Sequence, residues 1–336
     1  MAKTIAEGNE AIVKGALKAG LGFYAGYPIT PASEIMHELS KSDIAFVNAE
    51  DEIASVSMII GASLAGKKSM TATSGPGFSL MQEGIGLAHM MRVPVVIVNS
   101  QRVGPSTGMP TLAAQADMLQ AYHGSHGDFV SIAFYPNSAE ECYKYTIEAF
   151  NAAEDARCPV FLLSDAILSH LAESVDLDAI KVQLKERKIK PLGSGNRHFT
   201  GLLSKDGIPK TKDSLYYRQW YKSYKDEVMS AAGRYNFYEY IENKNSDTLI
   251  ISYGILSRAV SEMSNEYALF RPIRVFPILD ELREIAKKYK KITVIEMNDG
   301  QYATLIESFL KREVRKIPVL GGTVSADEIR KELRNE

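Results

Sequence analysis

Cysteine is scarce in this sequence of 336 residues, which contains only Cys142 and Cys158. Neither cysteine has a second one two positions away or a pair of histidines close by. A cysteine-bound metal centre or an iron–sulfur cluster needs several such ligands together. The sequence therefore predicts no metal site on this chain.

Long hydrophobic runs and an excess of one charge are also missing. The chain carries 39 Lys and Arg against 41 Asp and Glu, a formal net charge of −2. No stretch approaches the roughly 18 uninterrupted apolar residues of a membrane span, and the first residues lack the apolar core of a signal peptide. These absences argue against a membrane protein and against a nucleic-acid-binding chain, and they predict a soluble, cytoplasmic protein.

Short β-rich runs alternate with helix-like periodic segments from residue 7 to about residue 170, which is typical of an α/β fold with a doubly wound parallel sheet. We expect this domain over residues 1–172, a basic connector with aromatic residues and no sustained periodicity over 173–243, and a smaller α/β domain over 244–336. The expected strands are 22–25, 44–47, 69–73, 94–98, 129–134 and 159–163 in the first domain, and 248–252, 273–277, 292–296 and 317–320 in the second.

Two glycine-rich segments test the hypothesis of a dinucleotide site in such a sheet. Gly20-Leu21-Gly22 precedes a strand instead of following one, so it is interpreted as a helix end and a turn. Gly75-Pro76-Gly77 follows the strand 69–73 and leads into a helix from about residue 80, but Leu80 occupies the place of the third glycine. A tight turn is the favoured interpretation, and a ligand role for its backbone N–H groups stays open.

Two further segments follow strands at the expected carboxyl edge of the sheet, where open α/β folds bind ligands. In the segment 27–33, Thr30 either caps a helix that begins with Pro31 or presents its hydroxyl to a ligand. In Asn48-Ala49-Glu50-Asp51-Glu52 the acids either complement a helix dipole, or one of them shares a proton with a heterocycle.

The loop 101–111 combines Arg102 with several hydroxyl side chains, two glycines and two prolines. A rigid loop of this kind suits the binding of a carboxylate, and a ligand role is favoured. His123 and His126 lie three positions apart with only one nearby aspartate, which is too few ligands for a metal. His126 remains a candidate site residue.

Six motifs, taken in order, resemble the alpha subunit of 2-oxoacid:ferredoxin oxidoreductases, and most closely the 2-oxoglutarate (2-oxoglutarate synthase) branch. The resemblance covers nearly the whole chain. It implies a pyrimidine-binding domain of a thiamine diphosphate enzyme followed by a domain that resembles the transketolase C-terminal domain. The motifs are Tyr27-Pro28-Ile29-Thr30-Pro31, Glu50-Asp51-Glu52, Thr73-Ser74-Gly75-Pro76-Gly77, the loop 101–111, His126-Gly127-Asp128 and Glu296-Met297-Asn298-Asp299-Gly300-Gln301.

The resemblance also selects a catalytic carboxylate. In thiamine enzymes the catalytic glutamate precedes a helix glycine by a fixed interval. Gly61 follows Glu52 by 61 − 52 = 9 positions and Glu50 by 61 − 50 = 11 positions. The interval of nine matches the family pattern, so Glu52 is the expected catalytic residue and Glu50 is the reserve.

By resemblance, the reaction is the coenzyme A-dependent oxidative decarboxylation of 2-oxoglutarate to succinyl-CoA and CO₂, with reduction of ferredoxin. Pyruvate and branched-chain 2-oxoacids are the alternative substrates, although the polar segment after Arg102 favours a second carboxylate. The expected substrate-binding residues are Thr30, Arg102, Ser106, Thr107 and His126. The expected cofactor-binding residues are Pro28, Thr30, Glu52, Gly75 and Gly77.

The Gly-Asp-Gly segment that binds Mg²⁺-diphosphate in thiamine enzymes is absent from this sequence. By resemblance, the diphosphate site, the Mg²⁺ and a [4Fe-4S] cluster belong to a beta subunit, possible gamma and delta subunits complete the complex, and this chain is inactive alone. Ferredoxin and coenzyme A are the other expected partners.

The connector allows other interpretations. Between residues 181 and 225 basic residues exceed acidic ones and alternate with aromatic residues. This composition fits a solvated connector, a strap over a partner subunit, or a site for single-stranded nucleic acid. A non-catalytic protein that binds a small anion or nucleic acid is therefore the alternative to an enzyme subunit.

Overall fold

The inner strands of the first sheet are buried along almost their whole length, whereas its edge strand over residues 45–48 is partly exposed. The computed structural model describes residues 3–194 and 200–335, and its first sheet has the strand order β15-β7-β8-β5-β4-β2-β3, with β6 paired to β5. Continuous apolar runs are typical of parallel strands that are covered on both faces. The expected strands are confirmed within a few residues as β2 (Phe23–Gly26), β3 (Ala45–Asn48), β4 (Ser69–Thr73), β5 (Val95–Val103), β7 (Ile132–Phe134) and β8 (Pro159–Asp165).

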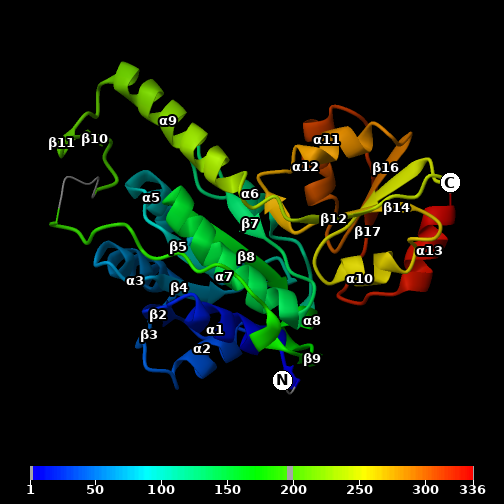
Figure 1. Ribbon diagram of the computed structural model, residues 1–336, viewed down its shortest axis with the longest axis horizontal. Helices are drawn as coiled ribbons and strands as arrows, with labels where there is room; N and C mark the ends of the chain where they lie inside the picture. Colours follow the sequence, from blue (N-terminus) through cyan, green and yellow to red (C-terminus); the bar gives the residue numbers. More distant parts are fainter. Residues whose placement is uncertain (1–2, 195–199, 336) are drawn as a thin grey trace.

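Helices cover both faces of this sheet (Figure 1). Alternate residues of β5 enter two different cores: Val96 and Val98 pack with helices α1 and α7, whereas Val95 and Ile97 pack with α3 and α5. The prediction of a doubly wound α/β domain is confirmed. Its helices are α1 (Gly8–Lys18), α2 (Ser33–Leu39), α3 (Glu52–Leu64), α4 (Gly75–Leu80), α5 (Gln82–Met91), α6 (Met118–His123), α7 (Ala139–Ala156) and α8 (Ala166–His170).

Three details of this domain differ from the sequence-based expectations. The helix expected from about residue 80 begins at Gly75, because Gly75-Pro76-Gly77 forms the first turn of α4. The loop expected over 101–111 is largely a hairpin, in which β5 continues to Val103 and the chain returns as β6 (Met109–Ala113). Finally, the helix after Thr30 starts at Ser33 with Ala32 as its N-cap, so Thr30 is not a cap.

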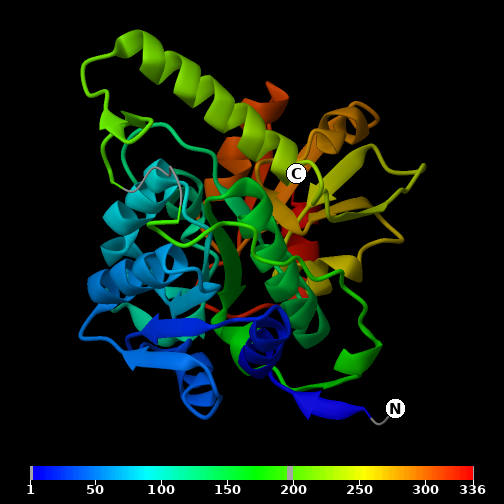
Figure 2. The ribbon, with the colours of Figure 1, turned by 60° about the vertical axis from the view of Figure 1, so that its left-hand side comes forward.

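The region expected to lack regular structure contains a helix of 19 residues, α9 (Ser214–Ala232). Figures 1 and 2 show α9 running along the upper side of the first domain with a small hairpin at its far end. Residues 195–199 of the expected connector lie outside the described part of the chain. The other elements here are β9 (Glu173–Val175), which pairs with β1 (Thr4–Ala6), the turn of 3-10 helix η1 (Leu177–Ala179), and the hairpin β10 (Ser204–Lys205) and β11 (Ile208–Pro209).

The second sheet has the order β12-β14-β13-β16-β17. Its strands β12 and β14 were not expected, and β12 lies within the region expected to be a connector. The strand expected over 273–277 is found as β15 (Arg274–Phe276), but it joins the first sheet antiparallel to β7. Hydrophobic periodicity identifies a strand without showing which sheet receives it. The elements are β12 (Tyr238–Ile241), β13 (Thr248–Ile251), β14 (Ala268–Pro272), β16 (Lys291–Glu296), β17 (Arg315–Pro318), α10 (Leu256–Ser261), α11 (Glu281–Ala286), α12 (Gln301–Leu310) and α13 (Ala326–Arg334).

None of the helices in residues 3–194 and 200–335 combines the length and the apolar composition needed to span a membrane.

Candidate functional site

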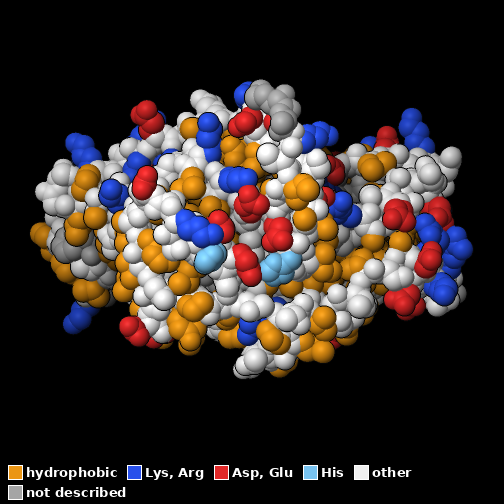
Figure 3. Space-filling view, turned by 90° about the horizontal axis from the view of Figure 1, so that it is seen from below, with side chains coloured by type: hydrophobic (Ala, Val, Ile, Leu, Met, Phe, Trp, Pro, Cys, Tyr) orange, Lys and Arg blue, Asp and Glu red, His pale blue; other side chains and the backbone are white. Residues whose placement is uncertain are grey.

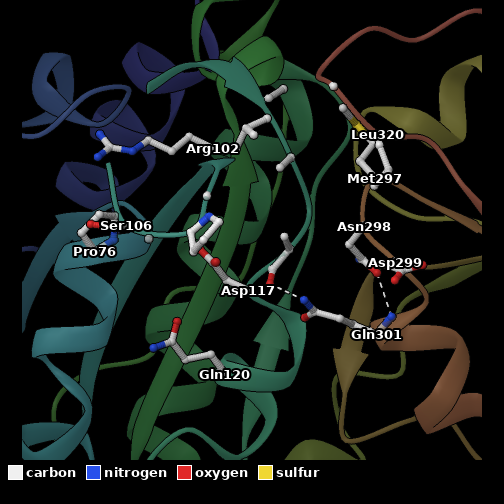
Figure 4. Close-up of a pocket in the computed structure, with 18 of the residues that line it drawn as sticks. Pro76, Arg102, Ser106, Asp117, Gln120, Met297, Asn298, Asp299, Gln301 and Leu320 are labelled. Carbon is white, nitrogen blue, oxygen red and sulfur yellow. Dashed lines mark hydrogen bonds between the residues drawn. The ribbon is translucent and has the colours of Figure 1, made fainter. Parts of the chain in front are cut away.

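A cavity of about 870 Å³ opens between the two domains. Figure 4 shows Arg102 and Asp117 on the first-domain side of this cavity, and Asn298, Asp299 and Gln301 on the second-domain side. Of the site residues predicted from the sequence, Gly75, Arg102 and Ser106 line this cavity. It therefore lies at the carboxyl ends of β4 and β5, which is the edge where ligands bind in open α/β sheets.

Arg102 keeps its charge available for a ligand. The residue is only 7% exposed, and its Nη1 donates a hydrogen bond of 2.7 Å to the backbone carbonyl oxygen of Thr30. Its Nε is buried without a partner, and it forms no ion pair with any residue that the structure describes. Burial lowers the pKa of Arg102, while Asp117 and Glu52 raise it, so the guanidinium has two carboxyl groups as electrostatic neighbours. Such a group is well suited to bind a carboxylate.

The three acids at the start of α3 have different roles. Asp51 is the N-cap, and its Oδ1 accepts a hydrogen bond of 2.7 Å from the backbone N–H of Ala54. Glu50 is exposed, whereas Glu52 is 5% exposed. Burial raises the pKa of Glu52, and the positive charge of Arg102 partly offsets this effect. Since Asp51 already caps the helix, Glu52 is left for another purpose.

Gly77 makes room for Glu52. A Cβ atom on Gly77 would overlap with Glu52 Oε1 and with Thr73 Oγ1. The backbone of α4 therefore passes directly against the Glu52 carboxyl group, and only glycine permits this approach. The glycine pattern that the sequence left open between a turn and a ligand site has a structural use, since it positions the buried glutamate.

The other predicted site residues lie outside the cavity lining. Thr30 adjoins the cavity through Arg102, while Pro28 and Thr107 are exposed on neighbouring loops. His126 lies elsewhere: it lines a separate hollow with Trp220 and Tyr217 of α9. The structure thus groups Thr30, Glu52, Gly75, Gly77, Arg102 and Ser106 and separates His126 from them.

Asp117 is a cavity residue that the sequence reasoning missed. Its Oδ2 accepts a hydrogen bond of 2.9 Å from Asn99 Nδ2, and its backbone N–H donates to Gln101 Oε1 at 2.8 Å. Burial raises the pKa of Asp117, although the bond from Asn99 and the charge of Arg102 oppose the shift. The available signal was the polar alternation of Asn99 and Gln101 at the end of an apolar strand, which places two amides on one side of the sheet.

Gln115 connects the first domain to the second domain beside this cavity. Its backbone N–H donates to the Met297 carbonyl oxygen at 2.9 Å, its Oε1 accepts from the Met297 N–H at 3.0 Å, and its Nε2 donates to the Tyr253 carbonyl oxygen at 2.9 Å. Asn298 Nδ2 donates to the Gln115 carbonyl oxygen at 2.7 Å. All four polar groups of Gln115 are therefore used across the domain boundary.

The motif 296–301 supports this contact from the second domain. Glu296 is 1% exposed and accepts hydrogen bonds from the Tyr253 hydroxyl, from Asn298 Nδ2, and from the backbone N–H groups of Tyr302 and Ala303. Gln301 Nε2 donates to the Ala116 carbonyl oxygen at 2.6 Å. The motif therefore fixes one wall of the cavity.

Five aromatic residues of the connector lie on α9, and some of them bind this helix to the first domain: Tyr216, Tyr217, Trp220, Tyr221 and Tyr224. Tyr224 is 1% exposed, and its hydroxyl lies 3.0 Å from His89 Nδ1. Glu227 forms ion pairs with Arg92 and Arg157.

The face of the molecule shown in Figure 3, below α1 and α8 in Figure 1, mixes acidic, basic and histidine side chains and has no broad basic patch.

Metal ligation is not a feature of the described residues, among which no group of three or more His, Cys, Asp or Glu side chains could hold an ion. Cys142 and Cys158 are both free and fully buried.

Comparisons with known proteins show the family of this chain. A family model described as pyruvate flavodoxin/ferredoxin oxidoreductase, thiamine diP-bdg, matches residues 14–235. The 2-oxoglutarate synthase subunit KorA of Methanocaldococcus jannaschii is 41% identical, with 96% of each chain covered. The protein of the same name from Archaeoglobus fulgidus is 38% identical, with 98% of each chain covered.

Among solved structures, a 2-oxoglutarate:ferredoxin oxidoreductase from Magnetococcus marinus with 2-oxoglutarate, coenzyme A and succinyl-CoA bound is similar, with a TM-score of 0.89 and 30% sequence identity. The match covers 99% of this chain and 65% of that longer chain. The resemblance that the motifs predicted is confirmed. This chain belongs to the pyruvate flavodoxin/ferredoxin oxidoreductase family, among the alpha subunits of 2-oxoacid:ferredoxin oxidoreductases that are close to 2-oxoglutarate synthase.

Proposed function

We propose that this chain supplies the aminopyrimidine side of a thiamine diphosphate site in an enzyme that converts 2-oxoglutarate, coenzyme A and oxidised ferredoxin to succinyl-CoA, CO₂ and reduced ferredoxin. The observation that carries the proposal is the buried carboxyl group of Glu52. It packs directly against the backbone of Gly77, and its charge interacts with that of the unpaired Arg102. Family membership supports the reaction class, and the names of the relatives support the substrate.

The residues present fit one half of the cofactor. Gly77 leaves a space that a side chain would fill, and Glu52 borders it with a carboxyl group whose raised pKa suits proton exchange with a ring nitrogen. When bound, thiamine diphosphate supplies the carbanion chemistry that decarboxylation of a 2-oxoacid requires. In this proposal Glu52 holds a proton at the aminopyrimidine ring nitrogen, and Pro28, Gly75 and Gly77 shape the pocket around that ring.

Arg102 is proposed to hold the carboxylate next to the oxo group of the substrate. Its buried guanidinium can form charge-assisted hydrogen bonds, and the contact with the Thr30 backbone fixes its orientation. Ser106 lines the cavity at the hairpin turn after β5, while Thr107 lies exposed beside it. We propose that these hydroxyl groups reach the second carboxylate of 2-oxoglutarate. Correct placement of the reacting groups is a large part of catalysis of this kind.

The rest of the active site is proposed to come from a beta subunit. The sequence has no Gly-Asp-Gly segment for Mg²⁺-diphosphate, and its two cysteines are too few for a [4Fe-4S] cluster. The apolar side chains of Tyr27, Ile53 and Leu80 are exposed. Tyr27 and Ile53 are next to Pro28 and Glu52 in the sequence, Leu80 lies on the same helix as Gly77, and such a partner would cover them. Gamma and delta subunits, and ferredoxin as the electron acceptor, are part of the same proposal.

The substrate proposal is tested with the complex purified from its host. Coenzyme A-dependent reduction of a viologen dye is measured with 2-oxoglutarate, pyruvate and a branched-chain 2-oxoacid at equal concentrations. We expect the highest kcat/KM with 2-oxoglutarate, because only this substrate uses the polar loop after Arg102. A preference for pyruvate would contradict the substrate assignment. Binding of single-stranded nucleic acid by a chain without a partner subunit would instead support the non-catalytic alternative.

Gly77→Ala tests how Glu52 is positioned. The added methyl group must displace the Glu52 carboxyl group or the α4 backbone, and a displacement of about 1 Å can cost on the order of 10²-fold in rate. We therefore expect kcat to fall about 10²-fold, with the complex still assembled. Gly233→Ala is the control, because a Cβ there meets no atom closer than 3.5 Å. Equal activity of both variants would show that Gly77 does not position a catalytic group.

A further inference from the structure

Asp117 and Glu52 flank the arginine that is proposed to bind the substrate. The pKa of Arg102 is affected by both carboxyl groups, and neither forms an ion pair with it. If all three groups are ionised, their summed charge is 1 − 2 = −1. The site is then net negative where an anion must bind, which is unfavourable at short range in a partly buried place.

The two carboxyl groups differ in access to the cavity. Asp117 lines the cavity wall, and Glu52 does not. The Asp117 Oδ2 is held by Asn99, but its Oδ1 accepts no hydrogen bond from the residues that the structure describes. The nearby Gly75 has no side chain, and a Cβ there would stand 3.8 Å from Asp117 Oδ2. One oxygen atom of Asp117 is therefore fixed in place, and the other is free to carry a proton.

The remaining groups around Asp117 do not compensate for its charge. Arg102 is the cation that acts on it, and Asp299 lines the opposite wall from the second domain. Tyr135 lies behind it with a hydroxyl group whose pKa is raised by burial, so it stays neutral. Asp51, beside Glu52, adds negative charge that raises the pKa of Glu52.

We propose that Asp117 takes up a proton when the carboxylate of a 2-oxoacid binds beside Arg102. This inference rests on the proposed function, because it takes the 2-oxoacid as the anion. A substrate carboxylate would change the summed charge from −1 to −2, and protonation of Asp117 restores −1. Asp117 is thus a positioning residue that adapts the charge of the site to its substrate, and substrate binding becomes coupled to proton uptake.

The test is calorimetric and needs no turnover. 2-Oxoglutarate is titrated into the complex depleted of thiamine diphosphate, at one pH near neutrality, in two buffers of different ionisation enthalpy. The difference between the observed enthalpies gives the number of protons taken up per bound ligand. We expect net uptake by the wild-type complex and almost none by Asp117→Asn. The asparagine retains an oxygen that can accept the hydrogen bond from Asn99, so the variant should fold.

The affinity provides a second readout. The Kd of the wild-type complex should rise as the pH increases, since the proton that Asp117 must take up on binding is then less available. For Asp117→Asn the Kd should depend far less on pH and should be lower on the alkaline side, by about tenfold for each unit of pKa coupling that is removed. Asp280→Asn is the control, because that side chain is 83% exposed on the second domain, and it should behave as the wild type does.

Binding without proton uptake, or uptake that persists in Asp117→Asn, would overturn this inference and leave the proposed function intact. Uptake that disappears in Glu52→Gln but not in Asp117→Asn would assign the proton to Glu52 and would also overturn it. If the wild-type complex bound no 2-oxoacid, the proposed function itself would fail, together with this inference.

Discussion

Replacement of Glu52 by glutamine is expected to lower the kcat of the assembled complex by about 10²- to 10⁴-fold, the range that general acid–base catalysis contributes. Glutamine has nearly the same shape but cannot exchange a proton at the aminopyrimidine ring nitrogen. The fold should tolerate the change, because α3 is capped by Asp51 and not by Glu52. The measurement is dye reduction by the complex, with its subunit composition determined by gel filtration.

Glu50→Gln is the matched control for this experiment. Glu50 is two residues away, has the same chemistry and is exposed. It should retain activity close to that of the wild type. If Glu50→Gln abolished turnover and Glu52→Gln did not, the catalytic role would pass to Glu50, and the interval to Gly61 would have been misleading.

The second large effect is on stability and follows from Glu296. Glu296→Ala removes the acceptor of four hydrogen bonds, from Tyr253, Asn298, Tyr302 and Ala303. Buried donors that lose their partner cost about 1–3 kcal/mol each, only partly additively. We expect the free energy of unfolding to fall by about 3–5 kcal/mol, because several buried donors lose their acceptor at once. Urea denaturation followed by circular dichroism measures this change.

Glu284→Ala provides the comparison for that prediction. Glu284 lies on α11, its side chain is 73% exposed, and it pairs with Lys287. Exposed ion pairs contribute about 0–1 kcal/mol, so the loss should stay within that range. If the two variants were equally stable, the hydrogen bonds to Glu296 would not stabilise the second domain.

The sequence was sufficient for most of the first domain because its strands are buried on both faces. Apolar runs such as β5 and β8 are most stable in the middle of a parallel sheet, where both faces are covered. The positions of both strands were therefore predicted within a few residues. Helix boundaries were less certain near glycine and proline. Gly75-Pro76-Gly77 was interpreted as a turn, but proline is also favoured in the first turn of a helix, and α4 starts there.

Long-range contacts explain what the sequence could not predict. Asp117 and Gln115 occur in a segment without a recognisable pattern, and their roles arise only when β5, α6 and the second domain come together. His126 shows the opposite case: it was included in the site through its motif, but it lies beside α9 in a separate hollow. Its role in substrate binding remains a sequence-based prediction.

The helix α9 was missed because it is basic and aromatic on several sides. Few of its residues are buried. One of them is Tyr224, which the sequence analysis assigned to a connector because of the basic and aromatic composition around it. Amphipathic patterns are weak when much of a helix is exposed. The sequence pattern therefore did not predict this helix.

The strand β15 has a consequence for how this chain can be divided. Although it lies in the chain between β14 and β16 of the second sheet, it covers the edge of the first sheet by pairing with β7. A fragment that ended between the domains would expose β7 as an open edge, and open edges promote association between chains. The last third of the chain is thus needed to cover the edge of the first sheet, even though most of the proposed catalytic groups lie in residues 28–117.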